Sequence, residues 1–228
     1  TAYAGEADSS THSAKIKSDV AGVTIVYGTS TDYGKTISGT VNANTDYTMS
    51  EVTRTAPGTT TVYYKVTKTG YNDVTGSTTI SITDSTAPLA NISSTNNTAA
   101  SQTVTLTATD TVGATAYYFG TKSSPSDSDF TNVTSTTSFS TTKTVSDAGT
   151  YYLKVKDAAG NVGKRSIVFY QTTFSVTNGT PSIAKVITAS GNSFNTATIT
   201  ANAGYTAATK WNKSSGGTVT VGASYTPA

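Results

Sequence analysis

Residues 147–162 read DAGTYYLKVKDAAGNV, and this stretch decides the fold that we expect for the chain. Apolar and polar side chains alternate along it, which is the pattern of a half-buried β-strand. Tyr151, Leu153 and Val155 share the face that we expect to be buried. Gly160 then supplies the left-handed backbone conformation of a tight hairpin turn. The stretch therefore predicts a corner, a strand and a turn into a second strand.

A weaker copy of this hairpin lies earlier, at residues 61–74 (TVYYKVTKTGYNDV). A second landmark also occurs twice, an aromatic-Gly-Thr sequence that begins at Tyr27 and again at Phe119. Each landmark precedes its hairpin by a similar spacing, which indicates an internal repeat of about 85 residues. A short polar junction that ends in Pro88 marks the first boundary. We expect three modules, at residues 1–84, 85–171 and 172–228.

The composition favours an all-β protein with a polar surface. Charged residues make up 12% of the 228 residues, against a usual fraction of about 25%, and threonine and serine take their place. Threonine and the 14 tyrosines favour strands. The net charge of +2 is dispersed along the chain, so we expect no nucleic-acid partner. No apolar run is long enough to span a membrane.

The chain has no cysteine, which excludes a disulfide framework and thiolate chemistry. A secreted β protein without disulfides fits the exterior of a Gram-positive bacterium, so we expect an extracellular or cell-surface location. Neither Met nor a signal peptide precedes Thr1. We therefore interpret the chain as a fragment of a longer protein, and we expect it to be monomeric.

Residues 85–171 resemble a bacterial immunoglobulin-like domain. Asp147, Gly149 and Tyr151 match the Asp-x-Gly-x-Tyr pattern with which that family enters strand F. The resemblance implies that Tyr151 is a tyrosine-corner residue, whose hydroxyl bonds to nearby backbone. Leu153 stands where many immunoglobulin domains have cysteine, so apolar packing alone would hold this core.

Asp157, Gly160 and Asn161 match the turn that these repeats have between strands F and G. VYYKV at residues 62–66 makes residues 15–83 look like a divergent relative from Gram-positive surface proteins. Residues 172–228 resemble an internalin-type B repeat, a small β-grasp-like module, on SGNSF at 190–194, AGYT at 203–206 and KWN at 210–212. The resemblances imply tandem immunoglobulin-like β-sandwiches followed by a small β-rich module.

The sequence does not show the combinations of residues that catalysis requires. His12 is the sole histidine, and we expect it to be solvated near a frayed chain start, where it activates no serine or threonine nucleophile. The carboxylates are scattered over loops, which does not favour the facing pair of a glycosidase. We therefore expect no enzyme activity, no catalytic residue and no cofactor.

A metal site is conceivable at Asp127 and Asp129, with Asp110 as a third ligand. Calcium needs about six to eight oxygen ligands, however, and two solvated aspartates in a Ser-rich loop explain the pair more simply. Local turn hydrogen bonds likewise explain Asp157 and Asn161. We therefore expect no bound metal.

Exposed aromatic rings are the candidate ligand contacts, because they can stack on sugars. We consider five of them, although we favour packing against neighbouring strands for the tyrosines, and filling of the small third core for the tryptophan: Tyr33, Tyr47, Tyr152, Tyr205 and Trp211. Of the expected hairpin, Tyr152, Lys154 and Lys156 point outward and remain free to meet a partner.

These observations favour a non-catalytic stalk or adhesion segment of a bacterial cell-surface or secreted protein. The alternative is a carbohydrate-binding accessory region of a secreted glycan-active enzyme. The partner is then a glycan, or a host or cell-surface protein, and a protein could also add a strand to an exposed sheet edge.

Overall fold

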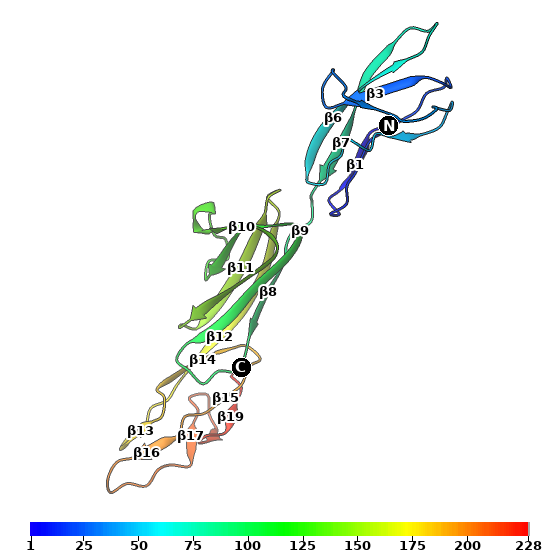
Figure 1. Cartoon of the computed structure of the whole chain (residues 1–228). Coiled ribbons are helices and arrows are strands. Elements are labelled where there is room, and N and C mark those ends of the chain that lie inside the picture. Colours follow the sequence, from blue (N-terminus) through cyan, green and yellow to red (C-terminus); the bar gives the residue numbers. More distant parts are fainter. Residues whose placement is uncertain (228) are drawn as a thin grey trace. The chain divides into compact units, whose positions relative to one another are not determined.

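The computed structural model describes residues 1–227 and is almost entirely β-sheet, which confirms the expected all-β class (Figure 1). The described chain divides into two compact units, Thr1–Thr86 and Ala87–Ala228. The one helical element within residues 1–227 is a short 3-10 turn, η1 (Asp127–Asp129). Accordingly, this part of the chain contains no helix that is both long and apolar enough to cross a membrane.

The first unit contains a five-stranded sheet and a separate two-stranded ribbon. The sheet order is β1-β7-β6-β3-β4, and β2 pairs with β5 to form the ribbon. All pairs are antiparallel except β1 with β7, which run parallel. The strands of this unit are β1 (Tyr3–Glu6), β2 (Lys15–Ile16), β3 (Thr24–Gly28), β4 (Lys35–Thr36), β5 (Tyr47–Thr48), β6 (Gly58–Thr67) and β7 (Val74–Thr83).

The core of the first unit lies against the middle of this sheet. Ile25, Val62 and Ile80, one from each of the three central strands, are fully buried. Met49, which follows β5, is also fully buried in the same cluster. The alternation of β-branched and polar side chains along these strands therefore directs their apolar side chains to one face.

The start of the chain is an ordered strand, so the expectation of a frayed end was wrong. β1 pairs with β7, and Tyr3 lies opposite Ile80. Glu6 then binds the end of β7, because its carboxylate accepts hydrogen bonds from the Thr83 hydroxyl at 3.0 Å and the Ser85 amide at 3.0 Å. The sequence YAGE has no apolar periodicity, so the backbone pairing supplies the order that the side chains do not signal.

The second unit is built on a curled sheet in the order β10-β9-β11-β12-β14, with β8 paired to β9 (Figure 1). Its 19-residue strand β9 pairs with β8 and β10 in its first half, and with β10 and β11 in its second. The strands of this sheet are β8 (Leu89–Ser94), β9 (Gln102–Gly120), β10 (Thr131–Val145), β11 (Gly149–Asp157), β12 (Val162–Thr173) and β14 (Lys185–Ala189).

The strand predicted from residues 147–162 is β11, and it lies between β9 and β12. Leu153 and Val155 are fully buried, and they meet Leu106 of β9 in one core. Tyr152 and Lys154 alternate with them on the outer face. The predicted division of side chains between the two faces of this strand is therefore confirmed.

Tyr151 supports the core through its ring and not through its hydroxyl. The ring packs against Phe119 at 5.5 Å between centroids and against Phe169 at 5.4 Å. Burial raises the pKa of Tyr151, with a smaller contribution from Asp147. The hydroxyl makes no hydrogen bond to any described residue, so the tyrosine-corner bond implied by the family resemblance is absent from residues 1–227.

The turn after β11 is closed by Asp157 and Asn161. The Asp157 carboxylate accepts hydrogen bonds from the Asn161 amide and from its side-chain nitrogen, each at 2.9 Å. The Asp157 amide in turn donates to the Asn161 carbonyl at 3.2 Å. Gly160 has φ 93, the left-handed conformation expected of it.

The C-terminal segment has its own small core but shares the sheet of the second unit. The core contains Phe174, Phe194 and Trp211. The expected boundary between residues 171 and 172 falls inside β12, because β14 continues the sheet and its Ile187 enters the main core. The remaining short strands are β13 (Gly179–Pro181), β15 (Phe194–Asn195), β16 (Ile199–Ala201), β17 (Lys210–Asn212), β18 (Thr218–Thr220) and β19 (Ser224–Tyr225).

The central position of β11 leads to a stability prediction. We expect Leu153→Ala to lower the free energy of unfolding of the second unit by about 3 kcal/mol, because it leaves a cavity in a closely packed core. The same substitution at Leu89, which is 75% exposed, should change it by less than about 0.5 kcal/mol. Urea denaturation of the two variants measures the difference. Equal effects would contradict this assignment of the core.

Candidate functional site

The outer face of β11 and β12 forms a shallow groove of about 580 Å³. The register places Tyr152 opposite Ser166 and Lys154 opposite Lys164. Arg165 also borders the groove but lies opposite the buried Leu153, so its side chain starts on the other face of the sheet. The floor of the groove therefore carries one aromatic ring, one hydroxyl and two basic groups.

Ser123 and Ser124 form one wall of the groove, and they belong to a loop that is held in place at both ends. At its start, the Lys122 amide donates a 2.8 Å hydrogen bond to the Tyr118 hydroxyl. Asp129 then closes the turn, because its carboxylate accepts from both the amide and the hydroxyl of Ser126 at 2.8 Å. The ion pair with Lys122, at 2.5 Å, and the Ser126 bonds lower the pKa of Asp129 to about 2.

The other end of this loop is fixed by Lys156 of β11. Its ammonium group pairs with the Asp127 carboxylate and lies 4.1 Å from the centre of the Phe130 ring. The hydrogen bond from Lys156 lowers the pKa of Asp127. Asp127 and Asp129, considered above as metal ligands, therefore each bind a lysine and stabilise the loop.

Asp110, the third carboxylate considered for that metal site, lies elsewhere, at a bend in β9. Its Oδ1 accepts hydrogen bonds from the Val112 amide at 2.9 Å and the Gly113 amide at 2.7 Å. Its carboxylate lies within 4.8 Å of that of Asp157. Asp157 in turn binds Asn161, so Asp110 shapes a bend within β9 and Asp157 shapes the turn at the end of β11.

The positive charge of the groove is not neutralised by the protein. Lys154 and Lys164 form no ion pair with any acidic group of residues 1–227. Lys154 and Lys164 face each other across an antiparallel pair, an arrangement that destabilises a sheet. The fold itself gains nothing from this pair, so the charges are available to an external anion.

Small neighbours leave the Tyr152 ring accessible on the outer face. Gly120 of β9 and Ser166 of β12 are its cross-strand neighbours. The Tyr118 ring occupies the space above Gly120, because a Cβ there would lie 2.5 Å from the Tyr118 hydroxyl oxygen. Tyr118 itself is buried under the loop, whereas half-buried Tyr152 lines the groove. Of the five aromatic candidates, this groove contains Tyr152 alone.

Trp211 was wrongly considered as a ligand contact, because it is a core residue. Only 9% of it is exposed, and its ring lies 5.0 Å from that of Phe174. Its indole nitrogen donates a 2.8 Å hydrogen bond to the Ala197 carbonyl. With its ring packed and its one donor bonded, Trp211 offers no surface to a ligand.

The other three aromatic candidates lie apart from the groove. The Tyr47 hydroxyl binds the Asn42 amide at 2.7 Å and the Thr40 carbonyl at 3.3 Å, so Tyr47 organises a loop of the first unit. Tyr33 sits in the turn after β3 and lines a separate shallow pocket of that unit. Tyr205 is 58% exposed at a turn of the C-terminal segment.

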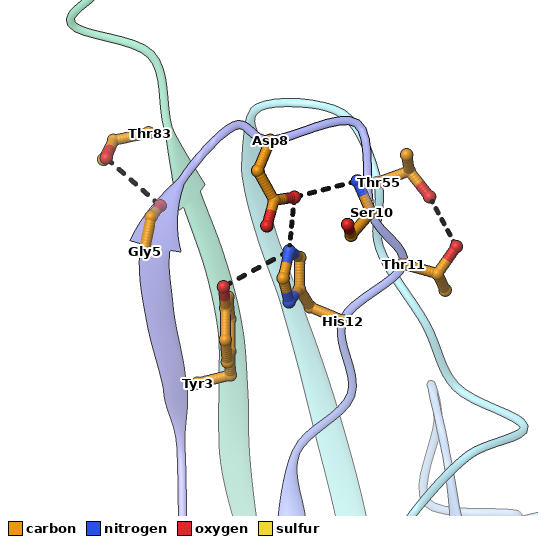
Figure 2. Close-up of polar contacts among 8 residues, drawn as sticks. All are labelled: Tyr3, Gly5, Asp8, Ser10, Thr11, His12, Thr55 and Thr83. Carbon is orange, nitrogen blue, oxygen red and sulfur yellow. Dashed lines mark hydrogen bonds and ion pairs between the residues drawn. The ribbon is translucent and has the colours of Figure 1, made fainter.

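His12 is not the solvated residue that we expected. Figure 2 shows its ring stacked on Tyr3, with 4.1 Å between the ring centroids. Its Nε2 lies 2.9 Å from the Asp8 carboxylate and 3.2 Å from the Tyr3 hydroxyl, and its side chain is 14% exposed. Ordering of β1 brings Tyr3 beneath the histidine, an effect that the sequence pattern did not reveal. This cluster therefore closes the start of the chain onto the first unit.

The facing lysines in the groove lead to a prediction. We expect Lys164→Thr to raise the free energy of unfolding by about 0.5 kcal/mol, since it removes like-charge repulsion and introduces a β-branched residue. Urea denaturation should show that the gain shrinks as salt screens the charges. Lys210→Thr, an exposed strand position opposite Thr220, is the control for the change in β propensity. If Lys164→Thr lowered stability and Lys210→Thr did not, the expected repulsion between Lys154 and Lys164 would be contradicted.

The Asp8–His12 bond leads to a pH prediction. The hydrogen bond from His12, followed by that from the Ser10 amide, lowers the pKa of Asp8 below its usual value of 3.8. This stabilisation is complete above the unfolded pKa and is lost as pH falls through the lower folded pKa. We expect thermal unfolding of the first unit to show a smaller loss of stability on acidification below about pH 4 in Asp8→Asn than in the wild type. Asp19→Asn, which removes an exposed carboxylate, should keep the wild-type slope; a matching change there would refute the role of Asp8.

Comparison with known proteins does not assign this chain to a family. No family model matches it, and no curated protein matches it. Among solved structures, a weak similarity is to a chain described as the Bacteroides ovatus mixed-linkage glucan utilization locus SGBP-B in complex with a mixed-linkage heptasaccharide. The two sequences are 12% identical and the TM-score is 0.25. The similarity covers 96% of this chain and 65% of the length of that one.

Proposed function

We propose that this chain is a non-catalytic segment of a bacterial cell-surface or secreted protein, and that it acts as an adhesion module within a stalk. The observation that carries this proposal is the groove on β11 and β12, where Lys154 and Lys164 lack acidic partners among residues 1–227. An open sheet face suits the binding of an extended surface, whereas catalysis needs groups that enclose a substrate and exclude water.

The titratable groups of the described residues support binding over catalysis. His12 is stacked on Tyr3 and bound to Asp8, far along the sequence from the groove. Asp127 and Asp129, the acids of the groove wall, are ion-paired with lysines. No carboxylate on the groove itself stands ready to act as an acid or a base. The lining thus offers cations, hydroxyls and an aromatic ring, which are recognition groups.

A carbohydrate-binding role is the second candidate, and the setting of Tyr152 favours it. Its cross-strand neighbours are Gly120, which the Tyr118 ring covers, and the small Ser166, so a flat ligand meets no bulky side chain on the Ser166 side. Ser123 and Ser124 supply hydroxyls on the adjacent wall. An aromatic platform beside hydroxyl groups matches a sugar ring, which has apolar faces and a polar rim.

The test is binding of the chain to an array of neutral and acidic glycans, with Tyr152→Ala as the variant. We expect Tyr152→Ala to weaken binding about tenfold, which corresponds to the loss of about 1.4 kcal/mol of ring contact. Tyr205→Ala removes an exposed tyrosine outside the groove and should leave binding unchanged. Binding that survives Tyr152→Ala would overturn the assignment of the groove, and a chain that binds no glycan would overturn the carbohydrate-binding role.

A further inference from the structure

We infer that the groove on β11 and β12 binds an acidic polysaccharide, a glycan chain that carries carboxylate or sulfate groups. The inference rests on the proposed binding role of this face and adds the chemical class of the ligand. Its basis is the positive charge of the groove, which no acidic group in the described part of the protein neutralises through an ion pair.

The acidic groups of the loop that borders the groove are already engaged. Asp127 pairs with Lys156, and Asp129 pairs with Lys122, so these four charges cancel at the wall. Lys154 and Lys164 remain, and neither forms an ion pair with a carboxylate of residues 1–227. A neutral ligand would leave this repulsion in place, whereas an anion placed between the two lysines would relieve it.

The positions of the two lysines suit a shared anionic group. Lys154 and Lys164 are directly paired across two strands, so their side chains start about 5 Å apart and can converge on one carboxylate or sulfate. Arg165 lies between Lys164 and Ser166 along β12, so its side chain starts on the opposite face of the sheet and adds no charge to the floor of the groove.

The remaining lining favours a sugar polymer over other polyanions. Ser123, Ser124 and Ser166 are exposed hydroxyls that can both donate and accept, as sugar hydroxyls require. Single-stranded nucleic acids instead use several aromatic side chains on which successive bases stack, and Tyr152 is the one ring in this groove. The basic side chains, the hydroxyl groups and the one aromatic ring of the groove thus match a glycan that carries charged substituents.

The experiment is calorimetric titration of the whole chain with four polymers. Polygalacturonate supplies carboxylates, its fully methyl-esterified form removes them, dextran sulfate supplies sulfates, and dextran is neutral. We expect binding to polygalacturonate or dextran sulfate, and the better of the two identifies the preferred anion. Binding should weaken as salt is raised.

Lys154→Gln combined with Lys164→Gln is the decisive variant. We expect it to weaken acidic-polymer binding about tenfold at low salt. Lys17→Gln combined with Lys210→Gln removes the same charge from two exposed sites outside the groove and should leave binding intact.

The outcomes separate this inference from the proposed function. Equal losses in the two double variants would show non-specific attraction and overturn the inference. Binding to dextran or to the methyl ester alone, abolished by Tyr152→Ala, would overturn the acidic class but keep glycan binding. If none of the four polymers binds, but beads coated with the chain still adhere to cells through the Tyr152 face, the inference is overturned and the adhesion role stands.

Discussion

The second unit depends on one constraint, the backbone pairing of β11 along both of its edges. Side chains alternate along a strand, so a slip of one residue would exchange the buried and exposed sets. Complete burial of Leu153 and Val155 therefore fixes the register against β9 and β12. The same register places Tyr152 and Lys154 on the outer face and sets Lys154 against Lys164. The groove is thus a consequence of how the core packs.

A loop covers part of the outer face of this sheet, and the groove lies beside that loop. Tyr118 of β9 points outward yet is 8% exposed, because the loop that ends at Phe130 lies over it. Lys156 holds that loop by its ion pair with Asp127 and its contact with Phe130. On the β12 side of the face, Lys164 and Ser166 are exposed.

Sequence reasoning predicted what depends on local periodicity and missed what depends on distant partners. The alternation in β11 and the turn at Gly160 follow from neighbouring residues, and both are confirmed. β1 was missed because YAGE has no pattern of its own and becomes a strand only beside β7, about eighty residues later. Trp211 was assigned both as a core residue and as a candidate ligand contact, since its burial depends on Phe174, which is distant in the sequence. For the groove, the alternation of side chains predicted that Tyr152 and Lys154 face outward. The positions of Lys164 and of the serine wall depend on the strand register and on the path of the loop, which the sequence pattern does not give.

Four lysines of the described chain form ion pairs with acids, and their setting differs from that of the groove lysines. Lys65 binds Asp73 at 2.8 Å, and Lys122 and Lys156 bind the two aspartates of the loop. The chain therefore places acids beside lysines where stability benefits, within the same loop that borders the groove. At Lys154 and Lys164 it places like charges opposite each other instead, which opposes folding. A local arrangement that disfavours the fold without compensation inside it is expected at functional sites, because the compensating group arrives from outside. The physical requirement at this face is negative charge, and that requirement gives the groove its chemical identity.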